Sequence, residues 1–138
     1  MITRFRHESP VQFIQTMREL MAHTIRYMGR MPKSERFTWT LPLIELCRNT
    51  LHSLVEANSL DVLEYREERK SVFSKAIGKM DALEEELSAL AFDPAWFALV
   101  NGDSKDCYPF VRWGELIDSE RRLLRKVMAS DENRVEGK

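Results

Sequence analysis

The sequence is poor in turn-forming residues, and this scarcity already excludes several fold classes. It has only 5 Gly and 5 Pro in 138 residues, too few for a sandwich or a barrel, in which turn signals recur every ~8–12 residues. No apolar run reaches the roughly 18 residues that a membrane-spanning helix needs. Residues 1–8 contain no apolar segment, so we expect no secretory signal and a cytoplasmic protein.

Cysteine and net charge are scarce as well. The 2 cysteines, Cys47 and Cys107, lack the paired spacing of a metal site, and we expect no disulfide in a cytoplasmic chain. Cys47 falls on an apolar helix face, where a buried thiol behaves as a small hydrophobic group. The formal net charge is −1, so composition alone does not indicate a nucleic-acid-binding protein.

What the sequence does contain is apolar residues at helical spacing, in steps of three and four. They predict helices at about 10–30, 34–58, 60–91 and 109–129. The expected buried stripes are Phe13, Ile14, Met17, Leu20, Met21, Ile25 and Met28 in the first helix; Thr40, Leu43, Ile44, Cys47, Leu51, Leu54 and Val55 in the second; and Trp113, Leu116, Ile117, Leu124 and Val127 in the fourth.

The third helix has the strictest pattern, a heptad seam that demands partner helices. Its members are Phe73, Ala76, Met80, Leu83, Leu87 and Leu90. Four helices joined by mostly short links predict an all-α, antiparallel up-down-up-down four-helix bundle, with residues 1–138 as one domain.

The helix ends and connections carry further expectations. Ser9 before Pro10 is an N-cap signal for the first helix. Ser34 is placed to cap the second helix, but Pro42 conflicts with an unbroken helix and predicts a kink or a restart. Residues 93–107 predict a short apolar turn or partial helix followed by a loop, and the polar residues 130–138 predict a flexible tail.

Charge is distributed unevenly along the chain. The net charge is +4 for residues 1–36, −6 for 80–107 and +2 for 108–126, and a polarised chain can present a basic face. The candidate nucleic-acid contacts are Lys33, Arg36, Arg112, Arg121, Arg122, Arg125 and Lys126, with Arg18, Arg26 and Arg30 adding positive charge. Three alternatives stay open: complementation of a helix dipole, salt bridges with the acidic residues 81–86, and plain solubility.

The patterns that support catalysis are missing from the sequence. His7, His23 and His52 lie on separate segments, without the pairing of a metal site. The consecutive residues Glu84, Glu85 and Glu86 point in different directions around a helix and cannot converge on an ion. There is no Gly-rich phosphate loop and no nucleophile with an evident base. We therefore expect a protein that is not an enzyme and has no cofactor or metal.

Aromatic residues are more numerous than one slim bundle needs. They include Trp39, Trp96 and Trp113, with Phe37, Phe97 and Phe110. They predict either a packed core or a subunit interface, where Trp, Phe, Met and Arg are enriched.

Two motifs carry a resemblance to a known family. Residues 32–37 read Pro-Lys-Ser-Glu-Arg-Phe, and residues 110–113 open the fourth helix with Phe-Val-Arg-Trp. Over about residues 10–129, the chain resembles the intervening-sequence/accessory-variability-determinant family of small bacterial four-helix bundles. Some members are encoded within ribosomal RNA genes, and others assist the reverse transcriptase of diversity-generating retroelements. Against this pattern, residues 93–107 look like an insertion.

The resemblance implies a ring-like homo-oligomer, a homopentamer, and an accessory protein that binds nucleic acid and a reverse transcriptase. The net charge of −1 departs from the strongly basic retroelement members. The alternative therefore stays open: an intervening-sequence-type bundle that acts through protein contacts and does not bind nucleic acid. The gene neighbourhood, a reverse transcriptase or a ribosomal RNA operon, would separate the two.

Overall fold

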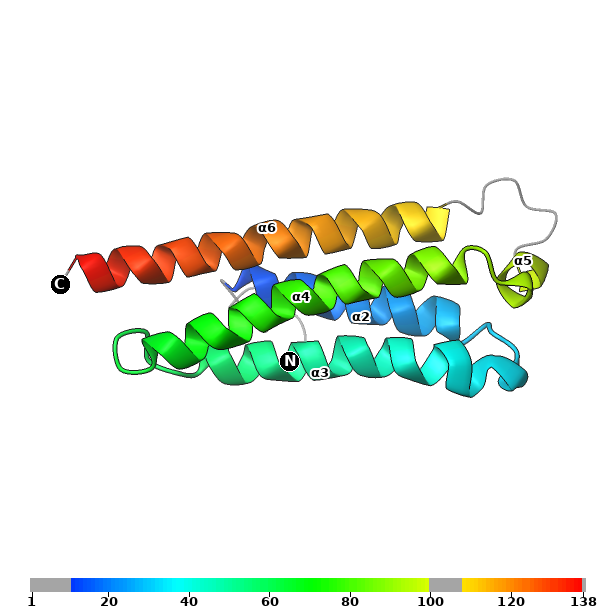
Figure 1. The fold of residues 1–138 in the computed structure, drawn as a ribbon, viewed down its shortest axis with the longest axis horizontal. Coiled ribbons are helices and arrows are strands. Elements are labelled where there is room, and N and C mark those ends of the chain that lie inside the picture. The colour runs from blue at the N-terminus through cyan, green and yellow to red at the C-terminus, as the bar shows by residue number, and fades with distance from the viewer. Residues whose placement is uncertain (1–10, 100–107, 138) are drawn as a thin grey trace, which may run out of the picture.

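The computed structural model describes residues 11–99 and 108–137, which form an elongated helical rod (Figure 1). Its elements are α2 (Gln12–Met28), the 3₁₀ turn η1 (Lys33–Glu35), the π-helical turn η2 (Arg36–Thr40), α3 (Leu41–Asn58), α4 (Arg66–Leu90), α5 (Pro94–Leu99) and α6 (Tyr108–Glu136). The four long helices pack in a ring, α2 on α3, α3 on α4, α4 on α6 and α6 on α2. The predicted all-α bundle is confirmed, and Figure 1 shows successive long helices running in opposite directions.

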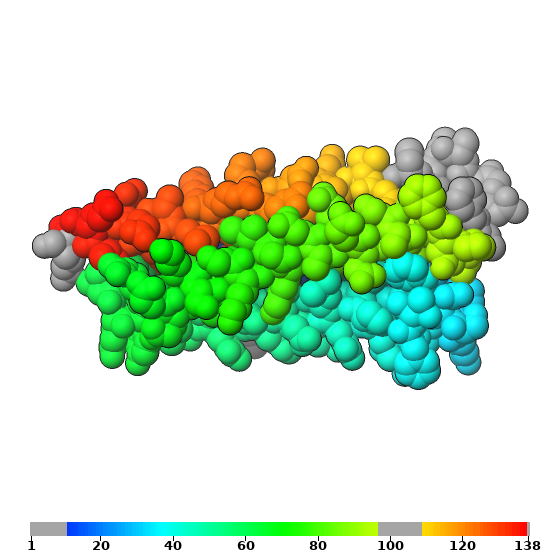
Figure 2. Space-filling model, in the orientation of Figure 1, coloured from blue at the N-terminus to red at the C-terminus, as the bar shows by residue number. Residues whose placement is uncertain are grey.

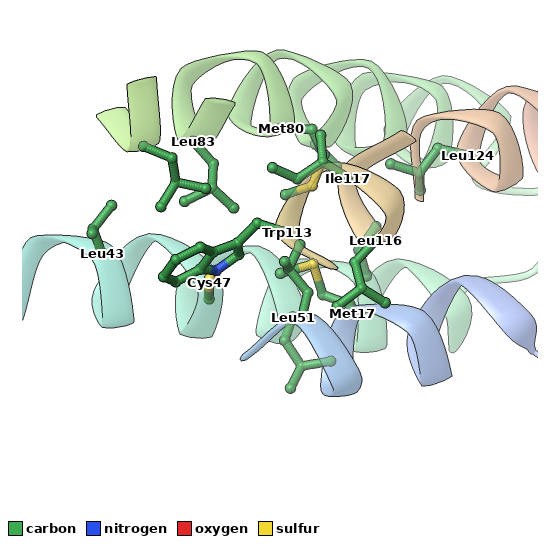
Figure 3. Close-up of a cluster of buried hydrophobic side chains, with 14 of the residues drawn as sticks. Met17, Leu43, Cys47, Leu51, Met80, Leu83, Trp113, Leu116, Ile117 and Leu124 are labelled. Atoms are coloured by element: carbon green, nitrogen blue, oxygen red, sulfur yellow. The ribbon is translucent and has the colours of Figure 1, made fainter. Parts of the chain in front are cut away.

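The core confirms the heptad seam of the third predicted helix. All six seam residues are buried on α4. Figure 3 shows side chains from all four long helices converging, with Met80 of α4 beside Ile117 of α6 and the Trp113 ring over Cys47 of α3. Because neighbouring helices supply apolar side chains at every level, α4 buries its stripe within one chain. None of the helices in the described ranges is both long and apolar enough to cross a bilayer.

Single stripe positions were predicted less well than the helices. Ile25 and Val55 are exposed, so their assignment to the core was wrong. Thr24 takes the core position next to Ile25, because its hydroxyl donates to the Leu20 carbonyl oxygen at 2.9 Å and is thus satisfied inside the bundle. Trp39, Trp96 and Trp113 are all buried, which favours the core interpretation of these three side chains.

The connection from α2 to α3 resolves the conflict at Pro42. The chain passes through η1 and η2 before α3 begins at Leu41, so Pro42 lies in the first turn, where no N–H donor is needed. The predicted restart is therefore confirmed. Ser34 as the cap of this helix was wrong, because Ser34 lies within η1 and the N-cap position of α3 is Thr40. The predicted cap at Ser9 and Pro10 lies outside the described residues.

Two aspartates shape the turns on either side of α4. The Asp61 carboxylate accepts hydrogen bonds from the backbone N–H groups of Leu63 and Glu64 at 3.1 and 2.9 Å. This turn delays the helix to Arg66, so the predicted start at residue 60 was wrong. Asp93 Oδ1 accepts from the backbone N–H of Ala95 at 2.7 Å and starts α5. The predicted partial helix is confirmed, while the predicted loop at 100–107 lies outside the described residues.

The predicted flexible tail is the largest error. Residues 130–136 continue α6 to Glu136. Asp131 is buried and forms an ion pair with Arg69 of α4, with 2.8 Å between Arg69 Nε and Asp131 Oδ2. The polar composition therefore reflects a helix end that is held by a charged contact.

Candidate nucleic-acid interface

Arg121 lies in an ion-pair cluster. Its guanidinium donates to Glu84 Oε2 at 3.1 Å, to Asp118 Oδ1 at 2.6 Å and to Asp81 Oδ1 at 2.6 Å. These hydrogen bonds raise the pKa of Arg121 further above its usual range. Since Asp81 and Glu84 belong to α4, Arg121 joins α6 to the acidic residues of α4. For Arg121, the structure therefore shows salt bridges with the acidic residues of α4, one of the three alternatives to nucleic-acid contact.

Arg112 is also occupied by acidic neighbours. Its Nη2 lies 3.6 Å from Glu19 Oε2 of α2, and its Nη1 lies 3.5 Å from Glu115 Oε1 one turn further along α6. All three side chains are well exposed to solvent, so this cluster is weak. A phosphate would nevertheless compete with two carboxylates for the same guanidinium.

Arg122, Arg125 and Lys126 form a second group, here called the α6 cluster. All three are exposed, and their spacing of three and four residues places them on one face of α6. Within the described part of the chain none of them forms an ion pair. The acidic Asp118 and Glu132 flank the cluster along the helix, which lowers the local positive potential.

The remaining predicted residues, Lys33 and Arg36, belong to a third group at the end of the bundle. We call it the basic turn and define it as Arg26, Arg30, Lys33 and Arg36. All four side chains are exposed, and none is ion-paired with a residue in the ranges 11–99 and 108–137. They cover the last turn of α2 and the turns η1 and η2, at the end of the rod where α4 also ends (Figure 2).

Aromatic rings accompany the cations of the basic turn. Phe37 in η2 is 80% exposed, and the Arg36 guanidinium carbon lies 5.9 Å from its ring centroid. The Arg30 guanidinium carbon lies 4.9 Å from the ring centroid of Tyr27. A guanidinium over the face of an aromatic ring is attracted by the negative charge of that face. An exposed ring among cations can stack on a base while the cations contact the flanking phosphates.

The basic turn and the α6 cluster cannot form one compact site. The Arg112–Glu19 ion pair sets the register between α6 and α2, which run in opposite directions. From that level, Arg122 lies toward one end of the rod and Arg26 toward the other. At 1.5 Å per helical residue, they are separated by about 25 Å along the bundle. The structure thus divides the predicted set into two distant groups.

The groups that could support catalysis have other partners. His23 Nε2 donates to the Pro109 carbonyl oxygen at 2.9 Å, and burial lowers the pKa of this imidazole. Burial raises the pKa of Cys47 to about 11, so its thiol is protonated and a poor nucleophile at neutral pH. In the described ranges, no three His, Cys, Asp or Glu side chains are grouped as a metal site.

Sequence reasoning missed two buried acids of α6, Glu120 and Asp131. A signal for both was present, because residues 113, 117, 120, 124, 127 and 131 continue one pattern of three- and four-residue steps. The two acidic residues occupy positions of this buried stripe, where an ionisable side chain is unexpected.

Comparison with protein families, with curated proteins and with solved structures finds no match to this chain.

Proposed function

We propose that this protein is a cytoplasmic, non-enzymatic binding module that contacts single-stranded nucleic acid through the basic turn. The observation that carries the proposal is the 80% exposed ring of Phe37, which stands beside Arg36 in a turn whose cations make no ion pairs with described residues. Cations contact phosphates without reading the sequence, and an aromatic ring stacks on any base.

The competing explanation for basic residues at a helix end is complementation of the helix dipole. It applies to Arg26, which lies in the last turn of α2. It does not extend to Lys33 and Arg36, which lie beyond α2 in η1 and η2. It also gives no reason for an exposed phenylalanine at this place.

The test compares two triple variants that remove the same charge. One replaces Arg30, Lys33 and Arg36 with Ala, and the other replaces the α6 cluster with Ala. Binding of a fluorescent single-stranded oligonucleotide is titrated at two salt concentrations. We expect the basic-turn variant to bind far more weakly and to flatten the salt dependence by roughly 0.7 log units for each phosphate that it no longer neutralises.

The α6-cluster variant serves as the matched control and should retain most of the binding. Phe37→Ala should weaken binding of the single strand by about 1–3 kcal/mol and change duplex binding less. Equal losses in the two triple variants would mean that only the overall charge matters. Undetectable binding by the unmodified protein at low salt would refute the proposal.

The family resemblance extends the proposal to a homopentamer that assists a reverse transcriptase. Burial of Trp39, Trp96 and Trp113 within one chain removes these side chains as an argument for oligomerisation. The oligomer therefore depends on the resemblance and on the aromatic residues that stay exposed, of which Phe37 belongs to the predicted set. Light scattering at micromolar concentration tests it, and a stable monomer would contradict it.

A protein partner at the same end of the bundle is a second candidate. Phe92, between α4 and α5, is 85% exposed, and the hydrogen bond from Trp39 Nε1 to Asp93 Oδ2 at 3.0 Å ties its segment to η2. Exposed aromatic residues are common anchors in protein interfaces. Phe92→Ser should then abolish capture of the partner, whereas a nucleic-acid site built on Phe37 and the basic turn should keep its affinity.

A further inference from the structure

Glu120 is an ionisable side chain inside the bundle. It lies one helical turn from Ile117 and Leu124 on α6, and these two neighbours are buried. Glu120 itself is 0% exposed. Neither carboxyl oxygen has a hydrogen-bond partner among the described residues. A buried acid in this condition is rare, because burial without partners strongly disfavours the ionised form.

The helices packed against α6 bring no compensating charge to Glu120. The buried residues of α2 include no ionisable side chain. The only ionisable side chain among the buried residues of α4 is Arg69, which binds Asp131, about 16 Å further along α6 than Glu120. On α3, the only such residue is Cys47, whose thiol lies 3.5 Å from Thr24 Oγ1.

Some of the charged residues around the outside of this contact are engaged with one another, while Arg18 of α2 and Arg122 of α6 are exposed and form no ion pair with a described residue. Asp81 and Glu84 of α4 bind Arg121 of α6, and Glu19 of α2 faces Arg112. Desolvation is accordingly the cause that raises the pKa of Glu120 to about 8, from an ordinary value of 4.5. The carboxyl is neutral at pH 7 and loses its proton to solvent about one unit higher.

We propose that Glu120 is a proton-dependent lock on the packing of α6. With the carboxyl protonated, α6 packs against α2 and α4 in the closed bundle. With the carboxylate ionised, its negative charge requires water, and α6 loosens from both helices at this level. The inference is independent of the proposed nucleic-acid contact, because the basic turn lies at the end of the rod and Glu120 lies within it.

Hydrogen exchange of α6 peptides, measured by mass spectrometry from pH 6 to 9.5, tests this lock. The unmodified protein is compared with Glu120→Gln, a neutral side chain of the same shape, and with Glu132→Gln, which changes an exposed acid of the same helix. Each variant is compared with the unmodified protein at the same pH, so the intrinsic pH dependence of exchange cancels.

We expect α6 in the unmodified protein to lose protection relative to Glu120→Gln as the pH rises through about 8, while Glu132→Gln follows the unmodified protein. Between about pH 5 and 8, the unfolding equilibrium constant of the unmodified protein should also rise about tenfold per pH unit relative to Glu120→Gln.

Parallel profiles for the unmodified protein and Glu120→Gln would overturn the proposal. So would a loss of protection above about pH 8 that is no larger in α6 than in the other three long helices. The lower global stability expected between about pH 5 and 8 affects all four helices alike, so only an additional loss in α6 indicates the lock. If Glu120→Gln fails to fold, Glu120→Leu provides the same comparison with an apolar side chain, and the same two outcomes decide.

Discussion

Asp131 and Glu120 are both buried acids of α6, but they meet different surroundings. The Asp131 carboxylate accepts two hydrogen bonds from Arg69, from Nε at 2.8 Å and from Nη2 at 3.2 Å. Arg69 Nη1 also donates to the carbonyl oxygens of Ala57 and Leu60, at 2.9 and 3.1 Å. Glu120 has no such partner among the described residues. One site is a satisfied ion pair, and the other is an isolated carboxyl.

The difference shows how this bundle tolerates ionisable groups in its interior. At Asp131 the charge is kept, because a planar guanidinium presents several donors in fixed geometry and connects α4, α6 and the end of α3. At Glu120 the charge is removed by protonation, because no donor compensates for the lost water. The first arrangement stabilises one end of the rod. The second makes its middle sensitive to pH.

The largest expected effect follows from breaking the satisfied pair. Asp131→Ala leaves Arg69 buried without its anion, and this should lower the free energy of unfolding by about 3–5 kcal/mol. Urea denaturation measures the loss. Glu132→Ala is the matched control, since Glu132 is exposed and its removal should change stability by less than about 0.5 kcal/mol.

The double variant Arg69→Met with Asp131→Leu sharpens this prediction. It removes both charges together and should recover most of the lost stability, as apolar replacements of buried pairs often do. A small effect of Asp131→Ala would mean that α6 frays beyond residue 130. The flexible tail that the polar sequence predicts would then be correct.

The next effect has the opposite sign. Glu120→Gln should stabilise the protein at pH 7 by about 3 kcal/mol, because the unmodified side chain must take up a proton on folding at this pH. The raised pKa of Glu120 makes its contribution fully favourable below pH 4.5 and progressively lost as the pH rises to about 8. The gain should therefore vanish near pH 4.5. Urea denaturation at the two pH values measures the difference, and an equal gain at both would show that ionisation is not involved.

The sequence was sufficient to predict the helices, the seam of α4 and most of the core. Helical periodicity reports which face is buried, whatever that face contacts, so six of six seam residues were assigned correctly. Thr24 and Ile25 show the limit. Only the structure reveals that the buried position belongs to Thr24, because its hydroxyl forms hydrogen bonds with Leu20, Cys47 and Trp113 inside the bundle.

The sequence predicted the residues of the candidate site from their positive charge, and could not predict which of them are already ion-paired within the bundle. Lys33 and Arg36 were named from the sequence, but so was Arg121, and the three differ only in what lies near them in space. The partners of Arg121 on α4 are about 40 residues away along the chain. The burial of Asp131 was not predicted for the same reason, since its partner Arg69 lies 62 positions earlier in the chain. A pairing at such separation leaves no local pattern.

The smallest expected effect extends the comparison to the surface. Arg121 contacts three carboxylates, more than Asp131 has cations, yet each of these acidic side chains is at least 50% exposed. Exposed ion pairs are screened by water and salt, so Arg121→Ala should cost only about 0–1 kcal/mol. Thermal melts in low and high salt check this, and the difference between the unmodified protein and the variant should shrink as salt is added. If Arg121→Ala instead lowers stability as much as Asp131→Ala, the number of ion-pair partners affects stability more than their burial does. The contrast between the two buried acids, which depends on burial, would then lose its physical basis.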